Sequence, residues 1–297
     1  MHKYISIILL IILLPKTSFS QEGWMYFNEE PPNGQAKVFA ESVIGDVAHS
    51  SPTITPDYKQ IYWSIVKVND KPRKIYYSEY CNNRWLSPKM LFANDDYNYD
   101  QPFLSDDGSK LYFGSNHPSE ENISKKMRIN VCQKTDTLWS TPEVITGTMW
   151  TPSLTQDNVL YFIDQAEENK NNIGIYRAYY HDGTTLKKEL LPIEINKKDS
   201  QNWCPFISSD ESFLLFSSDR NKREGDFDIY ISYRDKEDKW SNPINLGDKI
   251  NTELQERFPS ISRDGKYLFF TRSKNEQNKH NLYWIDVESV NAMKRVK

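Results

Sequence analysis

The chain has 297 residues, 13% aromatic and 26% charged side chains and a mean hydropathy of -0.72, a composition that excludes a disordered chain and indicates a folded protein with a polar surface. This length suits one large all-β domain or two smaller domains. The formal net charge of -4 and the absence of a basic block argue against binding to nucleic acids or anionic membranes.

The first segment, residues 1–20, has the pattern of a secretory signal peptide. A basic start with Lys3 precedes the apolar run 5–14, which Pro15 ends. This run is too short to span a bilayer, and no second long apolar run follows. We therefore predict cleavage before Gln21 and export to the periplasm or the extracellular space, with no transmembrane segment after signal removal.

The rest of the chain repeats one pattern five times. Each copy opens with a proline, has a hydroxyl three residues later and an aspartate five residues later, and continues into an aromatic-rich run such as LYF or LFF. The prolines are spaced by 50, 50, 53 and 54 residues, at Pro52, Pro102, Pro152, Pro205 and Pro259. Repeats of this length are typical of propellers and solenoids.

Each copy predicts two strands joined by a tight turn. In the last copy, FPSISRDGKYLFFTRS, alternating apolar residues flank the Asp-Gly dipeptide at 264–265. An aspartate in such a turn accepts backbone N–H bonds, and so does the preceding Ser or Thr. We therefore assign a structural role in the turn to the repeated aspartates, Asp57, Asp107, Asp157, Asp210 and Asp264.

A second half follows in each repeat. The segments KIYYSEYCNNRWLSPKML, MRINVCQKTDTLWSTPEVI and DIYISYRDKEDKWSNPINL each predict a strand, a polar turn and a further strand. The further strand carries Pro88, Pro142 or Pro243, and proline is tolerated at a sheet edge because its missing N–H would face solvent. Each repeat is therefore predicted to form a four-stranded antiparallel blade with this strand outermost.

The fifth copy ends one strand short, after NLYWIDVESV, whereas GQAKVFAESVIG before the first copy resembles the fourth-strand segments. Placing that N-terminal strand on the last blade closes the ring and removes an exposed edge. We predict an all-β fold, a single β-propeller of five blades of four antiparallel strands, with 21–34 as a lead-in and 35–297 as the propeller domain. Six blades are the alternative and would need a further copy of the repeat.

The repeat motifs resemble those of a known family. SRDGKYLFFTRS and SDDGSKLYFGS are similar to the WD-like repeat of the TolB-type propellers, whose core is P-x-x-S-x-D-G-x-x-L-x-F-x-S, and SSDRNKREGDFDIYIS is similar to its continuation. The resemblance covers essentially the whole chain after residue 20 and implies an exported propeller protein. TolB carries an additional N-terminal domain that we do not expect here, so the resemblance does not extend to a role in the Tol complex.

Motifs of common catalytic and metal sites are missing from the sequence. It contains no G-x-G-x-x-G, P-loop or G-x-S-x-G motif, and its five histidines never fall at metal-ligand spacing. Cys81, Cys132 and Cys204 are too widely spaced for a CxxC site, and we expect buried thiols, with one disulfide left open. We therefore predict no catalytic residue, no metal and no cofactor.

Candidate binding residues precede the opening prolines, where the copies differ from one another. They are expected at the top of the innermost strands, around the central channel, and they combine aromatic rings with planar polar groups suited to a sugar or an extended peptide. The candidates are His49, Tyr99, Asp100, Trp150, Trp203, Glu256 and Arg257. Alternatively, Trp150 and Trp203 fill gaps between blades, and Glu256 and Arg257 form an ion pair at the rim.

Three functions fit this pattern. The first is a monomeric, non-catalytic binder of a glycan, peptide or protein partner at the channel mouth. The second is a glycan-processing hydrolase, in which Asp100 and Glu256 would supply the two carboxylates that such chemistry needs. The third is a scaffold in an envelope assembly that uses the rim or the bottom face.

Overall fold

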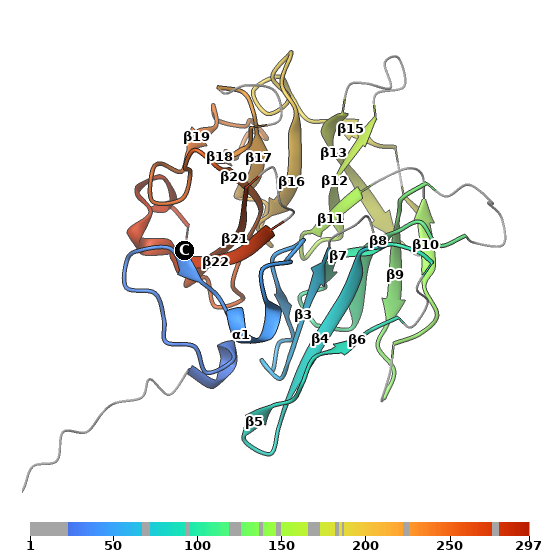
Figure 1. Cartoon of the computed structure of the whole chain (residues 1–297). Coiled ribbons are helices and arrows are strands. Elements are labelled where there is room, and N and C mark those ends of the chain that lie inside the picture. Colours follow the sequence, from blue (N-terminus) through green and yellow to red (C-terminus); the bar gives the residue numbers. More distant parts are fainter. Residues whose placement is uncertain are drawn as a thin grey trace, which may run out of the picture.

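The chain forms five antiparallel sheets arranged around a central axis (Figure 1). The computed structural model describes residues 23–66, 72–92, 96–118, 126–136, 139–146, 150–165, 173–181, 184–185, 187–221, 226–274 and 279–296. The predicted all-β fold, a five-bladed propeller, is therefore confirmed. The predicted signal peptide lies outside the described residues.

The first two blades follow the order of the repeats. Blade I contains β2 (Thr53–Ile54), β3 (Gln60–Ile65), β4 (Lys74–Cys81), β5 (Arg84–Trp85) and β6 (Lys89–Met90). Blade II contains β7 (Tyr99–Leu104), β8 (Lys110–Ser115), β9 (Arg128–Gln133) and β10 (Glu143–Thr146).

The third and fourth blades continue this order. Blade III contains β11 (Trp150–Leu154), β12 (Val159–Gln165), β13 (Ile173–His181), β14 (Thr184–Thr185) and β15 (Glu189–Leu190). Blade IV contains β16 (Asn202–Ile207), β17 (Phe213–Ser218), β18 (Asp228–Tyr233) and β19 (Ile244–Asn245).

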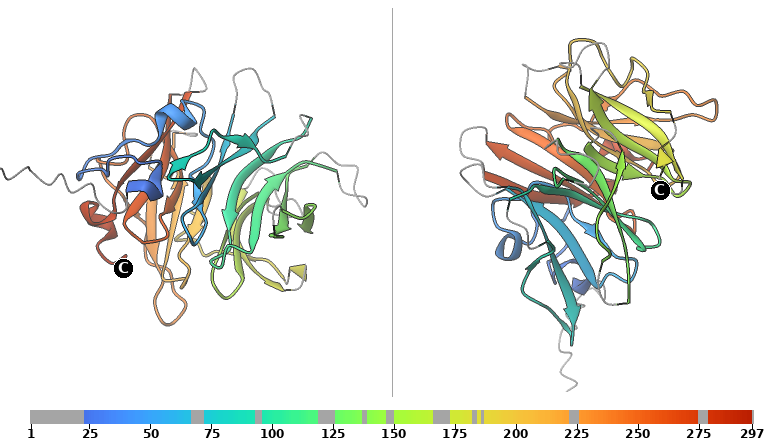
Figure 2. Two further views of the ribbon diagram at one scale, coloured as in Figure 1. Left: turned by 90° about the horizontal axis from the view of Figure 1, so that it is seen from below. Right: turned by 90° about the vertical axis from the view of Figure 1, so that its right-hand side faces the viewer.

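The fifth blade joins the two ends of the chain. It contains β20 (Gln255–Ile261), β21 (Tyr267–Lys274), β22 (Lys279–Asp286) and the N-terminal β1 (Lys37–Val38). Antiparallel pairing places Val38 opposite Tyr283, and the N–H of Phe39 donates to the carbonyl of Leu282 at 2.8 Å. Figure 2 shows this blue segment against the red strands of the C-terminal blade. The predicted closure by the N-terminal strand is confirmed.

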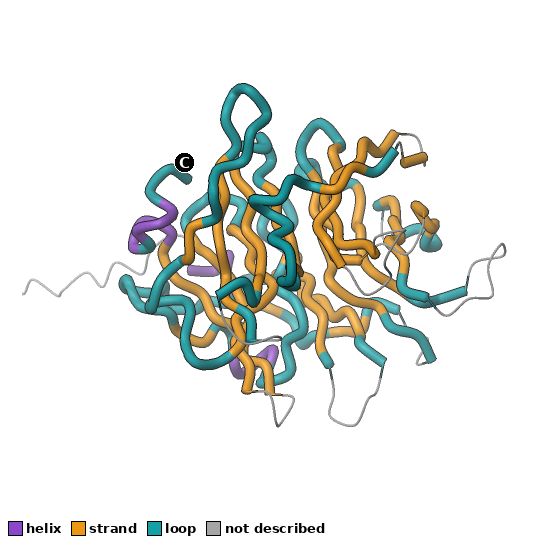
Figure 3. Tube along the Cα trace, turned by 90° about the horizontal axis from the view of Figure 1, so that it is seen from above, coloured by secondary structure: helices purple, strands orange, loops and turns teal. Residues whose placement is uncertain are grey.

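Helices occupy little of the described chain (Figure 3). They are the short α1 (Glu41–Ile44) and the 3-10 turns η1 (Gly23–Tyr26), η2 (Val287–Ser289) and η3 (Asn291–Met293). No helix in the described ranges is long and apolar enough to cross a membrane.

The outer strands of blades I and III are divided, which the sequence pattern did not indicate. β5 and β6 both pair with β4, and β14 and β15 both pair with β13. Pro88 lies between β5 and β6, where it has no N–H to donate to the ladder. The proline that we predicted at the sheet edge therefore lies between two short strands.

The hydrophobic core lies between the blades. Along β12, Phe162 packs in the cluster shared with blade II, whereas its neighbour Tyr161 packs in the cluster shared with blade IV. Because successive side chains of a strand point to opposite faces, a strand covered on both faces is apolar throughout. This explains the continuous runs LYF and LFF in the repeats.

The repeated aspartates lie in the turns between the first two strands of each blade. In blade II, the hydroxyl of Ser105 donates to Asp107 at 2.6 Å, and Asp107 accepts the N–H of Ser109 at 2.9 Å. The same hydroxyl accepts the N–H of Lys110 at 3.0 Å, so one short network holds both ends of the turn. Equivalent contacts to a backbone N–H are made by Asp57, Asp210 and Asp264.

These turns meet at one end of the axis. Arg263 of blade V donates to the carbonyls of Ser105 and Asp106 of blade II, and Ser209 of blade IV donates to the carboxylate of Asp106. The N–H of Gln156 donates to the carbonyl of Ser209 at 3.0 Å. Contacts between blades that are not neighbours therefore join the propeller at its hub.

The three cysteines are not joined by a disulfide in the structure. Cys132 and Cys204 are buried, as expected, whereas Cys81 is exposed at the end of β4. The expectation of a buried thiol is wrong for Cys81, because β4 there runs out of the blade into an exposed turn.

Candidate functional site

A cavity of about 420 Å³ on the axis is bordered by residues of all five blades, among them one residue at an equivalent position in each blade. We call these equivalent residues the ring and the space that they border the ring cavity. The ring consists of His49, Asp100, Trp150, Trp203 and Arg257. All five belong to the seven candidate residues from the sequence.

The ring residues are structurally equivalent. Asp100 pairs with Gly114, and Arg257 pairs with Thr271 at the corresponding place in its blade. In blades II to V, the register shifts by one residue between this position and the strand end, and the residue before each proline has a positive φ of 52 to 55°. This β-bulge directs the residue two places before the proline toward the axis.

Blade I reaches the same arrangement by a different path. Ala48 lies opposite Ile65, whereas Thr53 lies opposite Tyr62, so the register shifts by two residues instead of one. His49, three places before its proline, therefore takes the place that Asp100 takes in blade II. Its N–H donates to the carbonyl of Ser64 at 2.8 Å.

The other two candidates, Tyr99 and Glu256, do not border the ring cavity. Each directly precedes a ring residue in its strand, so its side chain points to the opposite side. Tyr99 is buried and stacks on Phe92 with ring centroids 4.6 Å apart.

Glu256 is fully buried, and its partner is Arg272 rather than Arg257. Its Oε1 accepts the Nε–H of Arg272 at 2.9 Å and the hydroxyl of Thr252 at 2.7 Å. Burial raises the pKa of Glu256, although these partners act in the opposite direction. The rim ion pair considered from the sequence is therefore replaced by an ion pair inside blade V.

Asp100 is the acidic member of the ring and is buried. Its Oδ1 accepts the hydroxyl of Ser64 at 2.7 Å and lies 3.0 Å from Nδ1 of His49. Its Oδ2 lies 3.5 Å from Nε of Arg73. Burial acts to raise the pKa of Asp100, but these neighbours outweigh it and hold the pKa below its usual range. Asp100 is therefore an ionised group held in place.

His49 is a neutral imidazole at physiological pH. Burial lowers its pKa, Asp100 opposes this effect, and the charges of Arg73 and Arg257 reinforce it. A neutral imidazole both donates and accepts hydrogen bonds, which suits contact with a ligand hydroxyl.

Arg257 is held by aromatic rings and has no carboxylate partner. Its guanidinium carbon lies 5.0 Å from the ring centroid of Phe227 and 5.5 Å from that of Trp203. No Asp or Glu in the described part of the chain forms an ion pair with it, and its buried Nε has no hydrogen-bond acceptor there. Cation–π contacts thus fix this charge without neutralising it.

The two tryptophans pack between blades and also border the ring cavity. Their rings are parallel within 2°, with centroids 6.0 Å apart, and both are half-buried against the core between blades III and IV. Trp203 also donates its Nε1–H to Gln201 at 3.1 Å. They fill the gap between these blades and present the remaining surface to the ring cavity.

Sequence reasoning missed several residues that complete the cavity lining. Gln101 directly follows a ring residue, and Gln201 lies two places before another, so their proximity to the ring was the available signal. Arg73 and Phe227 come from the chain just before β4 and β18, where no motif marks them.

The acidic residues of the ring cavity bear on the hydrolase alternative. Asp100 is the one carboxylate among its described lining residues, and glycosidases use two. No three His, Cys, Asp or Glu side chains in the described ranges come together as metal ligands.

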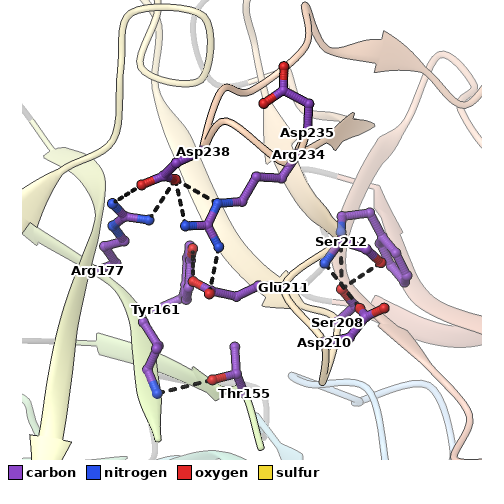
Figure 4. Close-up of polar contacts among 12 residues, drawn as sticks. Thr155, Tyr161, Arg177, Ser208, Asp210, Glu211, Ser212, Arg234, Asp235 and Asp238 are labelled. Carbon is purple, nitrogen blue, oxygen red and sulfur yellow. Dashed lines mark hydrogen bonds and ion pairs between the residues drawn. The ribbon is translucent and has the colours of Figure 1, made fainter. Parts of the chain in front are cut away.

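A second polar cluster lies away from the ring cavity, between blades III and IV (Figure 4). Arg177 contacts Asp238 at 2.9 and 3.0 Å, and Arg234 donates to Asp238 at 2.6 Å. Glu211 accepts from Arg234 at 2.5 Å and from the hydroxyl of Tyr161 at 2.7 Å. Because these side chains satisfy one another, the cluster holds the two blades together.

Comparison with known proteins gives a likeness of fold. Neither a family model nor a curated protein sequence matches the chain. TolB from Acinetobacter baumannii is similar in structure, with a TM-score of 0.50 and 15% identity over 81% of this chain and 55% of that one. Hydrazine synthase from Kuenenia stuttgartiensis has a TM-score of 0.51 and 12% identity over 91% of this chain and 42% of that one. The chain thus spans about half the length of these structures, and the likeness shows the propeller fold alone.

Proposed function

We propose that the protein is an exported, non-catalytic β-propeller that binds a ligand in the ring cavity. The observation that carries this proposal is the contrast between two sets of equivalent positions. The turn positions repeat the same aspartate five times, whereas the ring positions carry five side chains of which only the tryptophans recur. Binding residues are expected where a repeated scaffold varies.

The proposal also includes the family of the protein and its export. The WD-like motifs and the structural likeness to TolB support a place among the TolB-type propellers, and the pattern of residues 1–20 supports export. The partner of such a binder is a glycan, a peptide or another protein, and the size and mixed lining of the ring cavity suit a segment of any of these.

The hydrolase alternative lacks support from the geometry. Glu256, its second carboxylate, is fully buried and paired with Arg272, and it does not border the ring cavity. The scaffold alternative makes a different prediction from the binder, because its contacts would not depend on ring residues.

Substitution of the tryptophans tests the proposal. The purified protein is screened against arrays of glycans and peptides, and the ligands found are measured with Trp203→Ala and Trp150→Ala. Because aromatic contacts at the centre of a binding site dominate its affinity, each change should weaken binding by roughly tenfold or more. Tyr179→Ala, at an exposed aromatic on β13, is the control and should bind normally. Full affinity in both tryptophan variants would contradict the site and favour the scaffold.

A further inference from the structure

The charges that face the ring cavity do not balance. Arg73 and Arg257 border it, and Asp100 is the one acidic group among its described lining residues. Asp100 is already engaged by Arg73, Ser64 and His49, as its contacts of 2.7 to 3.5 Å show. One positive charge, that of Arg257, is therefore left without a counter-charge.

We propose that the ring cavity selects acidic glycans, whose sugar carboxylate pairs with Arg257. This inference rests on the binding function proposed above and names the class of ligand. A guanidinium offers a planar fork of donors that matches a carboxylate, and such charge-assisted pairs are among the strong polar contacts of binding sites.

The surroundings of Arg257 prepare it for this role. Phe227, Phe258 and Trp203 lie 5.0, 5.3 and 5.5 Å from its guanidinium carbon and restrict its position. Its buried Nε has no acceptor in the described chain, and no carboxylate there neutralises the guanidinium. A ligand carboxylate would satisfy the charge, and the fixed side chain would lose little conformational entropy on binding.

A glycan fits the inner strands better than an extended peptide does. Peptides often add as a strand to an exposed sheet edge, which needs a regular row of backbone donors. Each inner edge here carries a proline without an N–H, and in blades II to V a β-bulge precedes it. Recognition must therefore rely on side chains.

The remaining lining offers the side chains that sugar hydroxyls use. The amide of Gln101 and the imidazole of His49 both donate and accept hydrogen bonds. Trp150 and Trp203 add apolar surface against which the carbon face of a sugar can pack.

The test compares one sugar chain with and without its charge. Binding of oligogalacturonate is measured by calorimetry against the same oligomer with its carboxylates methyl-esterified, and oligomers of glucuronate and mannuronate extend the series. The protein is used as the wild type, as Arg257→Gln and as Arg84→Gln. Arg84 is exposed on β5, far from the axis. Arg84→Gln removes the same charge as Arg257→Gln and is therefore a matched control.

The acid form of at least one oligomer should bind roughly tenfold or more tightly than its ester, as expected for a hydrogen-bonded charge pair. Arg257→Gln should remove this preference, Arg84→Gln should keep it, and added salt should weaken it. If the acid and the ester bind equally and Trp203→Ala abolishes the binding of both, the selection for charge is wrong, but the proposed binding function is supported. Peptide binding in the cavity without uronate binding would also overturn it, and the absence of any ligand would overturn both.

Discussion

The residue after each repeated aspartate shows how single positions depart from the repeat. This residue has a positive φ in all five turns, which favours glycine and tolerates asparagine. The five residues are Tyr58, Gly108, Asn158, Glu211 and Gly265, with φ of 57, 70, 61, 58 and 73°. Glu211 is kept at an unfavourable backbone conformation, and its side chain contacts explain why.

Replacement of Glu211 by glycine should destabilise the protein although it relieves the backbone. The relief is about 1 kcal/mol, but Arg234 and the hydroxyl of Tyr161 lose a half-buried partner (Figure 4). We expect a net loss of about 1–2 kcal/mol in the free energy of unfolding, measured by denaturant titration. Asn158→Gly is the matched control and should change stability by less than about 0.5 kcal/mol, since Asn158 is exposed. Equal effects of the two changes would show that the cluster contributes nothing.

The sequence predicted where the candidate binding residues lie along the chain, but it did not predict the direction in which their side chains point. The opening prolines located the ring, but the segment before each proline contains residues that point both ways. Strand alternation, counted from the proline, separates Asp100 from Tyr99 and Arg257 from Glu256. The same rule would have excluded His49, because no feature of the sequence indicates the two-residue register shift in blade I.

Among the elements, the N-terminal strand carries the closure of the whole ring. The sequence predicted β1 by the missing strand of the last repeat, whereas the division of the outer strands had no such signal. Lys37 and Val38 of β1 pair with β22, and the N-terminal segment makes further backbone hydrogen bonds to β22 at Leu282 and His280. Phe39 directly follows and is fully buried in the cluster between blades V and I, 5.0 Å from Phe269 by ring centroids. Closure therefore combines these backbone contacts with the burial of the Phe39 side chain.

Truncation of Phe39 should open the propeller. Phe39→Ala should lower the free energy of unfolding by about 3–5 kcal/mol, because it leaves a large cavity beside Trp284. The neighbouring Val38→Ala, at a half-buried position of the same strand, should cost about 1 kcal/mol or less. Freed from β1, the edge of β22 should also promote self-association, visible in light scattering. A small loss for Phe39→Ala, with no association, would mean that the ring is closed mainly at the hub.

At the scale of the whole molecule, positive charge gathers around the axis at the ring cavity. His280 does not border the ring cavity, but its ring packs against that of the ring residue His49, with centroids 6.0 Å apart. Burial lowers the pKa of His280 to about 4, and the charges of Arg257 and Arg73, with that of His49 once it is protonated, act in the same direction. Burial also lowers the pKa of His49. Both imidazoles are therefore neutral in the folded protein at pH 7, whereas in the unfolded chain each has the ordinary value of about 6.5.

Stability should therefore fall as the pH drops from about 6.5 toward 4. In this window the unfolded chain binds protons that the folded chain does not, so acid favours unfolding, and the loss is absent above the unfolded pKa. Denaturant midpoints measured across the window should decline less steeply in His280→Asn than in the wild type. His117→Asn, at an exposed histidine after β8, should keep the wild-type slope. Parallel slopes for the wild type and His280→Asn would show that the half-buried imidazole of His280 does not couple folding to pH.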